Sequence, residues 1–516
     1  MKERRVRFAP SPTGPLHMGG VRTALYNYLY ARQGGGKFIL RIEDTDSQRF
    51  VPGAEEYIIE SLRWCGILPD EGVDAQGRIV EQPSSEHPHA PYRQSQRKAI
   101  YRKYAEELVA GGYAYYAFDS AESLAALRTE AEGRKETFTY NAATRGSLCN
   151  SLTLTEEETA GMLASRTDWT IRFKMPQGRK IAMDDLIRGH IEVLSDTLDD
   201  KVLWKRSDEL PTYHLANIVD DHLMEITDVI RGEEWLPSLP LHYLLYEAFG
   251  WEDSRPAFAH LPLLLKPDGK GKLSKRDGDR LGFPVFPLKW VSPTGEESRG
   301  YREDGYYSEA FVNLLALLGW NPGTEQEIFS LDELCEAFSI ERVVKSGAKF
   351  NPDKARWFNQ EYLRKRDLGL LAQEFRRDNP ELSAPYSDDY IARVLEMMRE
   401  RAHFASELPD LCRFFFTAPE SYDEAAAAKF WTEETRPLIP LVCDFLASAE
   451  SFDKEYLEEA LPNLVSSNGW PMGKVMNSLR LFLTGLGKGP GVAEMMAIMG
   501  REESLRRIAA AMQRLG

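Results

Sequence analysis

The sequence predicts an α/β head of the doubly wound, Rossmann type, which is interrupted by an inserted segment and followed by an all-α tail. Three observations lead to this fold class. The chain opens with strand, glycine turn, helix, strand and helix in that order, its character changes over about 84–205, and β-rich runs disappear beyond about Ser330. At roughly 150 residues per domain, the 516 residues suggest about three domains.

The N-terminal elements follow one another closely. Val6–Ala9 is a β-prone run that ends in a turn of Pro, Ser and Gly. Apolar residues recur at helical spacing over 21–33, and Gly34–Gly36 is expected to end that helix. A second strand over 37–42 and a helix over 51–65 complete the opening of a doubly wound sheet.

A different pattern begins at residue 84. The segment 84–205 combines a helical stretch at 92–111, the aromatic run Tyr113–Phe118, and short strands mixed with helix. We expect the aromatic side chains to pack in the core of this insertion, and stacking on nucleic-acid bases is the alternative. The α/β rhythm then resumes and continues through a helix at 239–249.

These changes of character set the expected domain boundaries. The α/β head comprises residues 1–83 and 206–329, and the insertion comprises 84–205. The tail is divided into 330–385 and 386–516, and both parts are expected to be helical.

Composition narrows the class of protein. Lys and Arg number 64 and Asp and Glu number 80, so the formal charge is −16. Nucleic-acid binders are usually basic overall, so this balance disfavours one, although a local basic face remains compatible with it. The five cysteines are scattered without ligand spacing, and no apolar run is long enough to span a membrane. Because no leader-like segment precedes the first strand, we expect a cytoplasmic location.

Two segments carry the chemistry. The first, APSPTGPLHMGG, joins the first strand to the first helix. Small residues at this place let a ligand approach the backbone, and the amides at a helix N-terminus face phosphates. His17 would donate to a phosphate oxygen without adding a full charge near pH 7. The alternative is a turn in which His17 only caps the helix.

The second segment is KLSKR, which lies in the polar, glycine-rich stretch 266–280. We expect this stretch to be an exposed loop. Lysines on such a loop suit a reaction in which negative charge grows on a phosphate, and a solvated surface is the alternative. An HxGG turn followed far along the chain by KLSKR resembles the two-part ATP site of class I aminoacyl-tRNA synthetases.

The chain as a whole closely resembles the bacterial glutamyl-tRNA synthetases, the glutamyl branch of class I. The resemblance covers essentially the whole chain. The segments that carry it, besides KLSKR, are RFAPSPTGPLHMGGVRTALYNYLYAR, FILRIEDTD, PYRQSQR, PTYHLANIVDDHLMEITDVIRGEEWL and LRLFLTGLGKGPGVAEMMAIMG.

This resemblance implies a glutamate–tRNA ligase that uses ATP with Mg²⁺, L-glutamate and tRNA(Glu), and that acts as a monomer. The insertion would bind the acceptor stem, residues 330–385 would contact the tRNA stem, and residues 386–516 would bind the anticodon. Glutamate would react with ATP to give glutamyl-adenylate in a step that requires bound tRNA. The glutamyl group would then pass to the terminal adenosine of the tRNA.

The resemblance also implies an ATP site. Its catalytic members would be His17, Lys272 and Lys275. The full set of ATP-binding residues would be His17, Gly19, Gly20, Glu234, Trp235, Leu264, Lys272 and Lys275.

The glutamate site follows from the same resemblance. Its members would be Arg7, Ala9, Ser11, Glu43, Tyr213, Asn217 and Arg231. Their chemistry is consistent with that role, because glutamate carries two carboxylates and one ammonium group. Arg7 and Arg231 supply forked donors for carboxylates, and Glu43 supplies an anion for the ammonium. We favour Arg231 for the side-chain carboxylate. A surface ion pair for Arg7 and a helix cap for Glu43 are the alternatives.

Three further expectations concern the rest of the chain. Tyr116 and Phe118 stand where some relatives carry a zinc-binding Cys-x-Cys pair, so we expect no zinc and no protein-bound metal. The Pro- and Gly-rich stretch 282–305 is expected to be a surface excursion. Arg399 or Arg401 would lie where the family reads the anticodon, although a solvated helix arginine is the simpler reading.

Several alternatives to the leading function remain open. The nearest is a non-discriminating enzyme that also charges tRNA(Gln). A non-catalytic tRNA-binding relative is a second, and the presence of His17, Glu43, Arg231 and both KLSKR lysines argues against it. A shortened tRNA-modifying relative is disfavoured by the long tail, and a glutaminyl-tRNA synthetase is disfavoured by Arg231.

Overall fold

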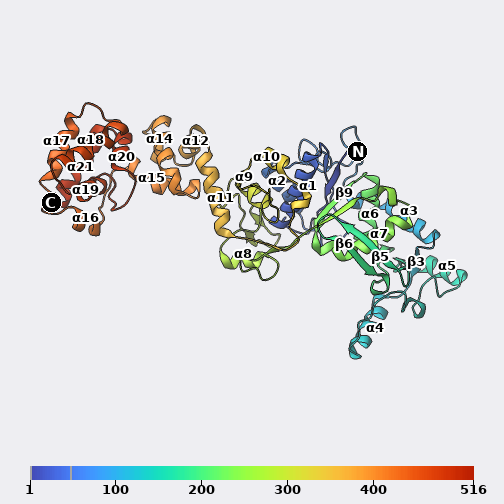
Figure 1. Cartoon of the computed structure of the whole chain (residues 1–516). Coiled ribbons are helices and arrows are strands. Elements are labelled where there is room, and N and C mark those ends of the chain that lie inside the picture. Colours follow the sequence, from blue (N-terminus) through green and yellow to red (C-terminus); the bar gives the residue numbers. More distant parts are fainter. Residues whose placement is uncertain (1–2, 47–48) are drawn as a thin grey trace. The chain divides into compact units, whose positions relative to one another are not determined.

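The computed structural model describes residues 3–46 and 49–516. The chain forms two compact units, Met1–Ala355 and Arg356–Gly516, which Figure 1 colours from blue to yellow and from orange to red. Each unit is described by itself.

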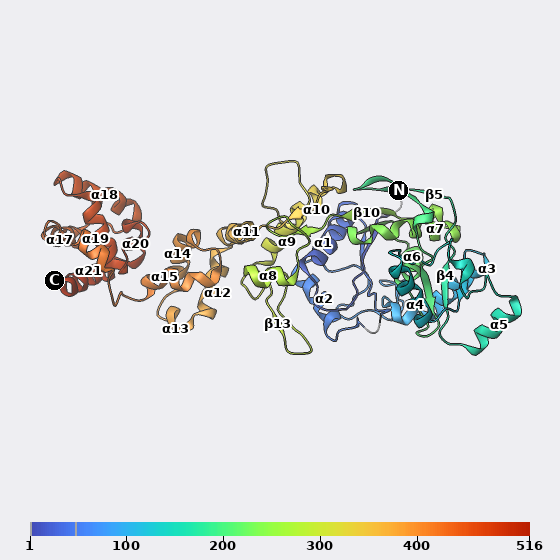
Figure 2. The same cartoon turned by 90° about the horizontal axis from the view of Figure 1, so that it is seen from below.

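The first unit is built on a six-stranded sheet. Its strand order is β2-β1-β9-β10-β5-β6, and all strands are parallel except β6. The strands are β1 (Arg5–Phe8), β2 (Lys37–Leu40), β9 (Asp228–Gly232), β10 (Ala257–Leu261), β5 (Lys180–Asp185) and β6 (Gly189–Leu194). Helices flank this sheet on both sides, with α1, α9 and α10 on one side and α6 and α7 on the other (Figures 1 and 2). The predicted doubly wound head is confirmed.

The helices of the first unit lie close to their expected positions where the apolar spacing is regular. They are α1 (Met18–Gln33), α2 (Ala54–Trp64), α3 (Lys98–Ala110), α4 (Ala121–Gly133), α5 (Glu156–Ser165), α6 (Tyr213–Leu223), α7 (Leu239–Ala248), α8 (Lys275–Leu281), α9 (Ser308–Ala316) and α10 (Leu331–Ala337). His17 caps the start of α1, and at its end Gly34 donates its amide to the carbonyl group of Ala31 and Gly35 donates to that of Arg32. The expected role of Gly34–Gly36 is therefore confirmed.

A second sheet lies within residues 84–211. It has the antiparallel order β3-β4-β7-β8, formed by β3 (Ala114–Ala117), β4 (Thr170–Phe173), β7 (Val202–Lys205) and β8 (Leu210–Pro211). Tyr115 and Phe118 are buried in its core, as core packing of the aromatic run predicts, whereas Tyr113 is 46% exposed.

The hairpin β5–β6 belongs to the same stretch of sequence but joins the larger sheet. β5 runs parallel to β10, with Asp185 paired to Phe258. Residues from within 84–205 therefore extend one edge of the sheet of the α/β head, and the contact between β5 and β10 matters for the site described below.

Two neighbouring glycine-containing segments, 266–280 and 282–305, differ from their expected form. The KLSKR loop continues into α8, because Ser274 and Asp277 form a capping box that starts this helix. The stretch 282–305 is also more than a surface excursion. Its exposed part is a small hairpin, β12 (Trp290–Val291) with β13 (Glu297–Ser298), but Phe286, Leu288 and Tyr301 at its base are buried.

In the residues that the structure describes, the regular elements of the second unit are all helices. Its helices are α11 (Pro352–Lys365, which begins in the first unit), α12 (Leu368–Asp378), α13 (Pro380–Ser383), α14 (Asp388–Met398), α15 (Leu408–Phe416), α16 (Glu424–Phe430), α17 (Leu438–Ser448), α18 (Lys454–Ser467), α19 (Met472–Thr484), α20 (Val492–Met499) and α21 (Arg501–Leu515). β-rich runs end before Ser330, as expected, and among the described residues beyond it one short strand remains, β14 (Ala348–Lys349), which pairs with β11 (Leu264–Leu265). Within residues 3–46 and 49–516, no helix combines the length and apolar character needed to cross a bilayer.

Candidate active site

Two adjoining clefts lie at the carboxyl ends of β1, β2 and β9, where ligands bind in open α/β sheets. We call them the arginine cleft and the histidine cleft. All seven residues predicted for glutamate line the arginine cleft, namely Arg7, Ala9, Ser11, Glu43, Tyr213, Asn217 and Arg231. The histidine cleft brings together six of the eight residues predicted for ATP, namely His17, Gly19, Gly20, Glu234, Leu264 and Lys272.

The arginine cleft has a buried ionic floor. Arg7 and Asp221 form a forked ion pair, with Nε to Oδ1 at 3.0 Å and Nη2 to Oδ2 at 3.2 Å. Arg41 binds the same carboxylate through Nη1 at 2.8 Å. Burial would raise the pKa of Asp221, but Arg7 and Arg41 outweigh it and hold the pKa below its ordinary value. The forked donors of Arg7 therefore bind a protein carboxylate. The alternative for Arg7 is a surface ion pair, and the structure has an ion pair that is buried instead.

Glu43 contacts Arg41 and forms a second ion pair with this arginine. Its Oε1 accepts from Arg41 Nη2 at 3.0 Å, and the amide group of Asn217 lies 3.3 Å away. With its oxygen turned toward the guanidinium groups, Asn217 accepts from Arg7 at 3.0 Å and from Arg41 at 3.2 Å. Burial raises the pKa of Glu43 more than Arg41 and Arg7 lower it. A ligand ammonium group would restore the favoured anionic state.

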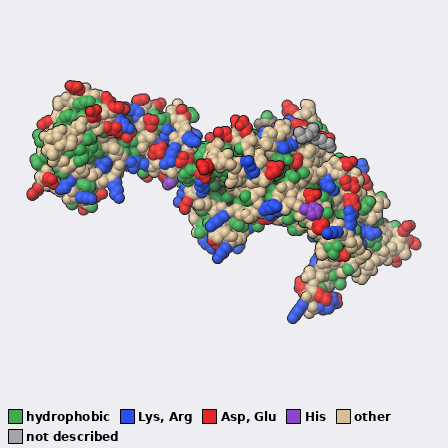
Figure 3. Space-filling view, in the orientation of Figure 1, with side chains coloured by type: hydrophobic (Ala, Val, Ile, Leu, Met, Phe, Trp, Pro, Cys, Tyr) green, Lys and Arg blue, Asp and Glu red, His purple; other side chains and the backbone are tan. Residues whose placement is uncertain are grey.

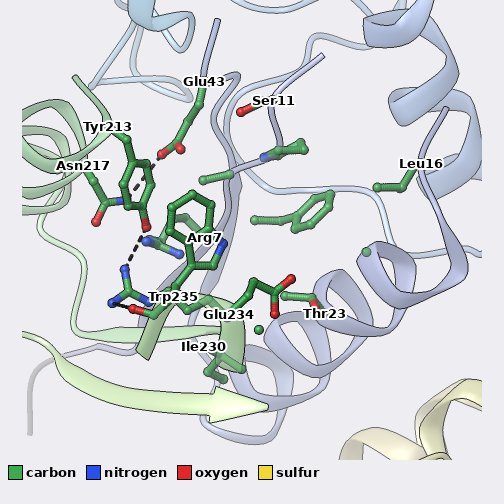
Figure 4. A pocket seen from close by; sticks show the side chains of 16 residues that line it. Arg7, Ser11, Leu16, Thr23, Glu43, Tyr213, Asn217, Ile230, Glu234 and Trp235 are labelled. Atoms are coloured by element: carbon green, nitrogen blue, oxygen red, sulfur yellow. Dashed lines mark hydrogen bonds between the residues drawn. The ribbon is translucent and has the colours of Figure 1, made fainter. Parts of the chain in front are cut away.

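Arg231 has a different setting. Its Nη1 donates to Tyr213 Oη at 2.8 Å, and its Nε donates to His260 Nε2 at 3.0 Å. It forms no ion pair with a carboxylate in the part of the chain that the structure describes. The ring of Tyr213 packs on Trp235, with centroids 4.1 Å apart. Figure 4 shows Tyr213, Asn217 and Glu43 on one wall and Trp235 and Glu234 nearby.

His17 forms the wall of the histidine cleft. Its Nδ1 accepts from the amide of Gly19 at 3.1 Å, so a neutral ring carries its proton on Nε2. This buried Nε2 has no hydrogen-bond partner among residues 3–46 and 49–516. Burial, and secondarily Lys272, lowers the pKa of His17 to about 4. His17 therefore both caps α1 and presents an unpartnered neutral donor.

Glycines allow the two clefts to adjoin. Gly20 and Gly232 line both of them. A Cβ on Gly20 would lie 2.5 Å from Cδ1 of Leu16, and a Cβ on Gly232 would collide with the carboxylate of Glu234. A side chain at either position would therefore require Leu16 or Glu234 to move, and neither glycine has an unusual backbone angle.

The two KLSKR lysines are placed differently. Lys272 lines the histidine cleft, where its Nζ lies 3.5 Å from Glu234 Oε1. Lys275 lines neither cleft, and its Nζ instead binds Glu296 Oε1 in the β12–β13 hairpin at 2.6 Å. In Figure 3, blue Lys and Arg side chains gather over α8. Trp235, the other residue predicted for ATP, lines the arginine cleft.

The two arginines predicted for the tail also differ. Arg399 Nη1 donates to the carbonyl oxygen of Arg366 at 2.8 Å, so its guanidinium ties two helical segments together. Arg401 is exposed. Burial, with Arg401 as a further cause, lowers the pKa of Arg480, which indicates that two cations share one surface.

Sequence reasoning missed the residues that hold this site from behind. Asp220 and Asp221 are buried on α6, and a pair of acidic residues within the apolar stretch LANIVDDHL was the available signal. Asp220 accepts from Arg97 at 2.7 Å and from Gln94 at 2.9 Å. The segment PYRQSQR thus has a structural role, because its side chains donate hydrogen bonds to the buried carboxylate of Asp220.

Comparison with known proteins places the chain among characterised families. Residues 3–357 match the family described as tRNA synthetases class I (E and Q), catalytic domain, and residues 368–512 match the anticodon binding domain. A glutamate–tRNA ligase of Porphyromonas gingivalis is 54% identical over 513 residues, which are 99% of each chain. The corresponding ligase of Parabacteroides distasonis is 53% identical over 99% of this chain and 98% of its own.

Solved structures agree with this placement. The crystal structure of a glutamate tRNA ligase from Elizabethkingia meningosepticum, in complex with its amino acid, has a TM-score of 0.91 at 50% identity and covers 100% of both chains. A glutamate-tRNA synthetase from Elizabethkingia anophelis has a TM-score of 0.88 at 50% identity, over 99% of this chain and 100% of its own.

Proposed function

This chain belongs to the glutamate–tRNA ligases, which are class I aminoacyl-tRNA synthetases, and on that premise we propose how its two clefts divide the work. The arginine cleft binds L-glutamate and the histidine cleft binds ATP. One observation carries this assignment: the clefts share Gly20, Thr23, Gly232 and Glu234, so a carboxylate held in one adjoins a phosphate held in the other.

Charge decides the orientation of glutamate. Arg231 has no carboxylate partner within residues 3–46 and 49–516, so its charge is available for the side-chain carboxylate. Tyr213 accepts from Arg231 and is left free to donate its own hydroxyl hydrogen to the same carboxylate. Glu43 receives the ammonium group. The α-carboxylate then faces the shared boundary of the clefts.

Activation is an in-line displacement. The α-carboxylate attacks the α-phosphate of ATP, the bond to the bridging oxygen breaks, and pyrophosphate leaves with that electron pair. His17 donates from Nε2 to a phosphate oxygen, and Lys272 and Lys275 stabilise the negative charge on the triphosphate. Lys275 must leave Glu296 to do so. Mg²⁺ is expected to enter with ATP and to be bound by phosphate oxygens.

Transfer uses the tRNA. The 2′-hydroxyl of the terminal adenosine attacks the activated carbonyl, and AMP leaves with the electron pair of the broken bond. We expect bound tRNA to be needed already for activation. Residues 84–205 would bind the acceptor stem, residues 330–385 the tRNA stem, and residues 386–516 the anticodon, with the enzyme acting as a cytoplasmic monomer.

The test is charging of purified tRNA(Glu) and tRNA(Gln) with radiolabelled glutamate, ATP and Mg²⁺, omitting each component in turn. Charging of tRNA(Glu) alone is the expected result. Charging of both tRNAs would show that the enzyme is of the non-discriminating kind, which also charges tRNA(Gln). Absence of charging with either tRNA would overturn the proposed function in favour of a binding module.

A further inference from the structure

Arg231 is held from behind by neutral groups. It is 5% exposed, and its Nε donates to His260 Nε2 at 3.0 Å. Its Nη1 donates to Tyr213 Oη at 2.8 Å and lies 3.3 Å from Nδ1 of His242. Two imidazoles and a hydroxyl thus fix the guanidinium without neutralising it. A carboxylate in the place of His260 would hold Arg231 equally well but would cancel the charge that an anionic ligand needs.

The acceptor role of His260 requires one tautomer. Nε2 accepts a hydrogen bond only while it carries no proton, so a neutral ring must carry its hydrogen on Nδ1. That nitrogen lies 2.6 Å from Oδ2 of Asp185. His260 is 0% exposed and Asp185 is 4% exposed, so bulk water is not available as a substitute. Asp185 therefore selects the tautomer in which Nε2 faces Arg231.

The sheet fixes the order of these three residues. His260 on β10 is the register partner of Arg231 on β9, and Asp185 ends the neighbouring strand β5. The other oxygen of Asp185, Oδ1, accepts from the amides of Ile187 at 3.0 Å and Arg188 at 2.8 Å. The carboxylate is thereby held by backbone on one side and by His260 on the other.

We propose that Asp185 and His260 are positioning residues that aim the guanidinium of Arg231 at the side-chain carboxylate of glutamate and so contribute to the choice of glutamate over glutamine. The proposal rests on the function proposed above. A guanidinium has five N–H donors. In Arg231 the Nε and both Nη1 hydrogens face protein acceptors, whereas Nη2 has the carbonyl oxygen of Trp235, at 3.5 Å, as its one partner in the described part of the chain. Nη2 is therefore the donor left for the ligand.

The pKa shifts of Asp185 and His260 support this arrangement. Burial and the charge of Arg231 lower the pKa of His260, against the effect of its hydrogen bond to Asp185. Burial would raise the pKa of Asp185, but His260 and the backbone amides outweigh it, so its pKa lies below the ordinary value. An ionised aspartate with a neutral histidine is the state in which Nε2 accepts.

The decisive variant is Asp185→Asn. The amide oxygen would keep the bonds from Ile187 and Arg188, which turns the NH₂ group toward His260. His260 would then accept at Nδ1 and place its hydrogen on Nε2, where it meets the Nε–H of Arg231. Two facing donors force the guanidinium to rotate. We expect KM for glutamate to rise about tenfold or more, because a buried donor loses its acceptor, while KM for ATP changes less than about twofold.

The matched control is Asp184→Asn on the same strand. The side chain of Asp184 is 86% exposed and contacts His190 at the surface, so the same chemical change should leave both KM values near those of the wild type.

Substitutions of His260 separate positioning from packing. In His260→Gln the amide oxygen takes the place of Nε2 and still accepts from Arg231. In His260→Asn the amide takes the place of Nδ1, so the bond to Asp185 is kept and the acceptor for Arg231 is lost. We expect His260→Asn to raise KM for glutamate several-fold more than His260→Gln, with no corresponding change in the inhibition constant of glutamine as a competitor.

The outcomes distinguish this inference from the proposed function. If the wild type charges no tRNA with glutamate, the proposed function fails and the inference fails with it. If the wild type charges but Asp185→Asn leaves KM for glutamate unchanged, only the inference is overturned. If Asp185→Asn does not fold, the two His260 variants decide. Equal losses in both of them, with equally lowered Tm, would show packing alone and would overturn the inference.

Discussion

The guanidinium of Arg7 lies against the carboxylate of Asp221 and makes two contacts, 3.0 and 3.2 Å, to that one buried group. Arg41 shares the same carboxylate. Two cations and one anion thus meet in the floor of the arginine cleft, and the carboxyl group of Glu43 lies beside Arg41. Of the two arginines that line this cleft, Arg231 rather than Arg7 is therefore the one that has no counter-charge among the described residues.

Removing the shared anion should destabilise the protein strongly. In Asp221→Asn, Arg7 and Arg41 stay buried without their main counter-charge, which costs about 3–5 kcal/mol of folding free energy. The measurements are the Tm and the free energy of unfolding in urea. Asp70→Asn is the control, because its partner Arg32 is 29% exposed and a pair that water reaches contributes less than a fully buried one. Equal losses in the two variants would contradict the assigned role of Asp221.

His17→Asn should separate the two roles of His17. The Asn side chain still accepts from the amide of Gly19 and so keeps the helix cap, but it places no donor where Nε2 stands. We expect adenylate formation, measured as tRNA-dependent pyrophosphate exchange, to slow about 100-fold with little change in Tm. A variant with normal exchange would show that Nε2 takes no part in activation.

Acid pH offers an independent test of the same histidine. Because the folded-state pKa of His17 is about 4 and its ordinary value is 6.5, the unfolded chain binds a proton that the folded chain does not between these values. Stability should therefore fall as pH decreases from 6.5 toward 4. His17→Asn should show a smaller difference in Tm between pH 7 and pH 5 than the wild type. An identical difference would mean that His17 is not neutral in the folded protein.

The contact between Lys275 and Glu296 should weaken ATP binding slightly. Lys275 binds Glu296 at 2.6 Å, and the carboxylate is 68% exposed. An exposed pair contributes little, so Glu296→Gln should lower KM for ATP only slightly, by no more than about fivefold. Lys275→Ala should instead abolish most charging while leaving tRNA affinity nearly intact. A higher KM for ATP in Glu296→Gln would show that the contact assists the lysine.

Local patterns in the sequence predict the elements well. Regular apolar spacing, a capping histidine and a stopping glycine define α1 because all three act within one helix. The start of α8 had a local signal too, the Ser274–Asp277 capping box, which a reading of KLSKR as loop overlooked. The sequence did not reveal that the base of 282–305 is buried. The Pro and Gly residues of this stretch indicate a surface loop, although apolar residues such as Phe286 and Leu288 alternate with them.

The residues behind the site could not be read from spacing. Asp221 lies 214 positions from Arg7, and Asp185 lies 75 positions from His260. Their partnerships depend on which strands the sheet places side by side. The hairpin β5–β6 joins the catalytic sheet from within the stretch that the sequence sets apart, and only this tertiary pairing brings Asp185 to His260.

The tail offers a comparison of two neighbouring arginines. Arg401 is exposed, whereas Arg399 binds the backbone of Arg366 at 2.8 Å. If Arg401 contacts the anticodon, Arg401→Gln should raise KM for tRNA about tenfold, since one specific contact is worth about 1–3 kcal/mol, and should leave KM for glutamate and ATP unchanged. Arg399→Gln should mainly lower Tm.

The salt dependence of binding then identifies what Arg401 contacts. Loss of a phosphate contact should reduce the slope of log affinity against log salt by about 1 and weaken all tRNAs alike. Loss of a base contact should leave the slope nearly unchanged and weaken tRNA(Glu) more than an anticodon variant of it. Binding of both tRNAs equal to that of the wild type would remove Arg401 from the interface and leave it a solvated helix arginine.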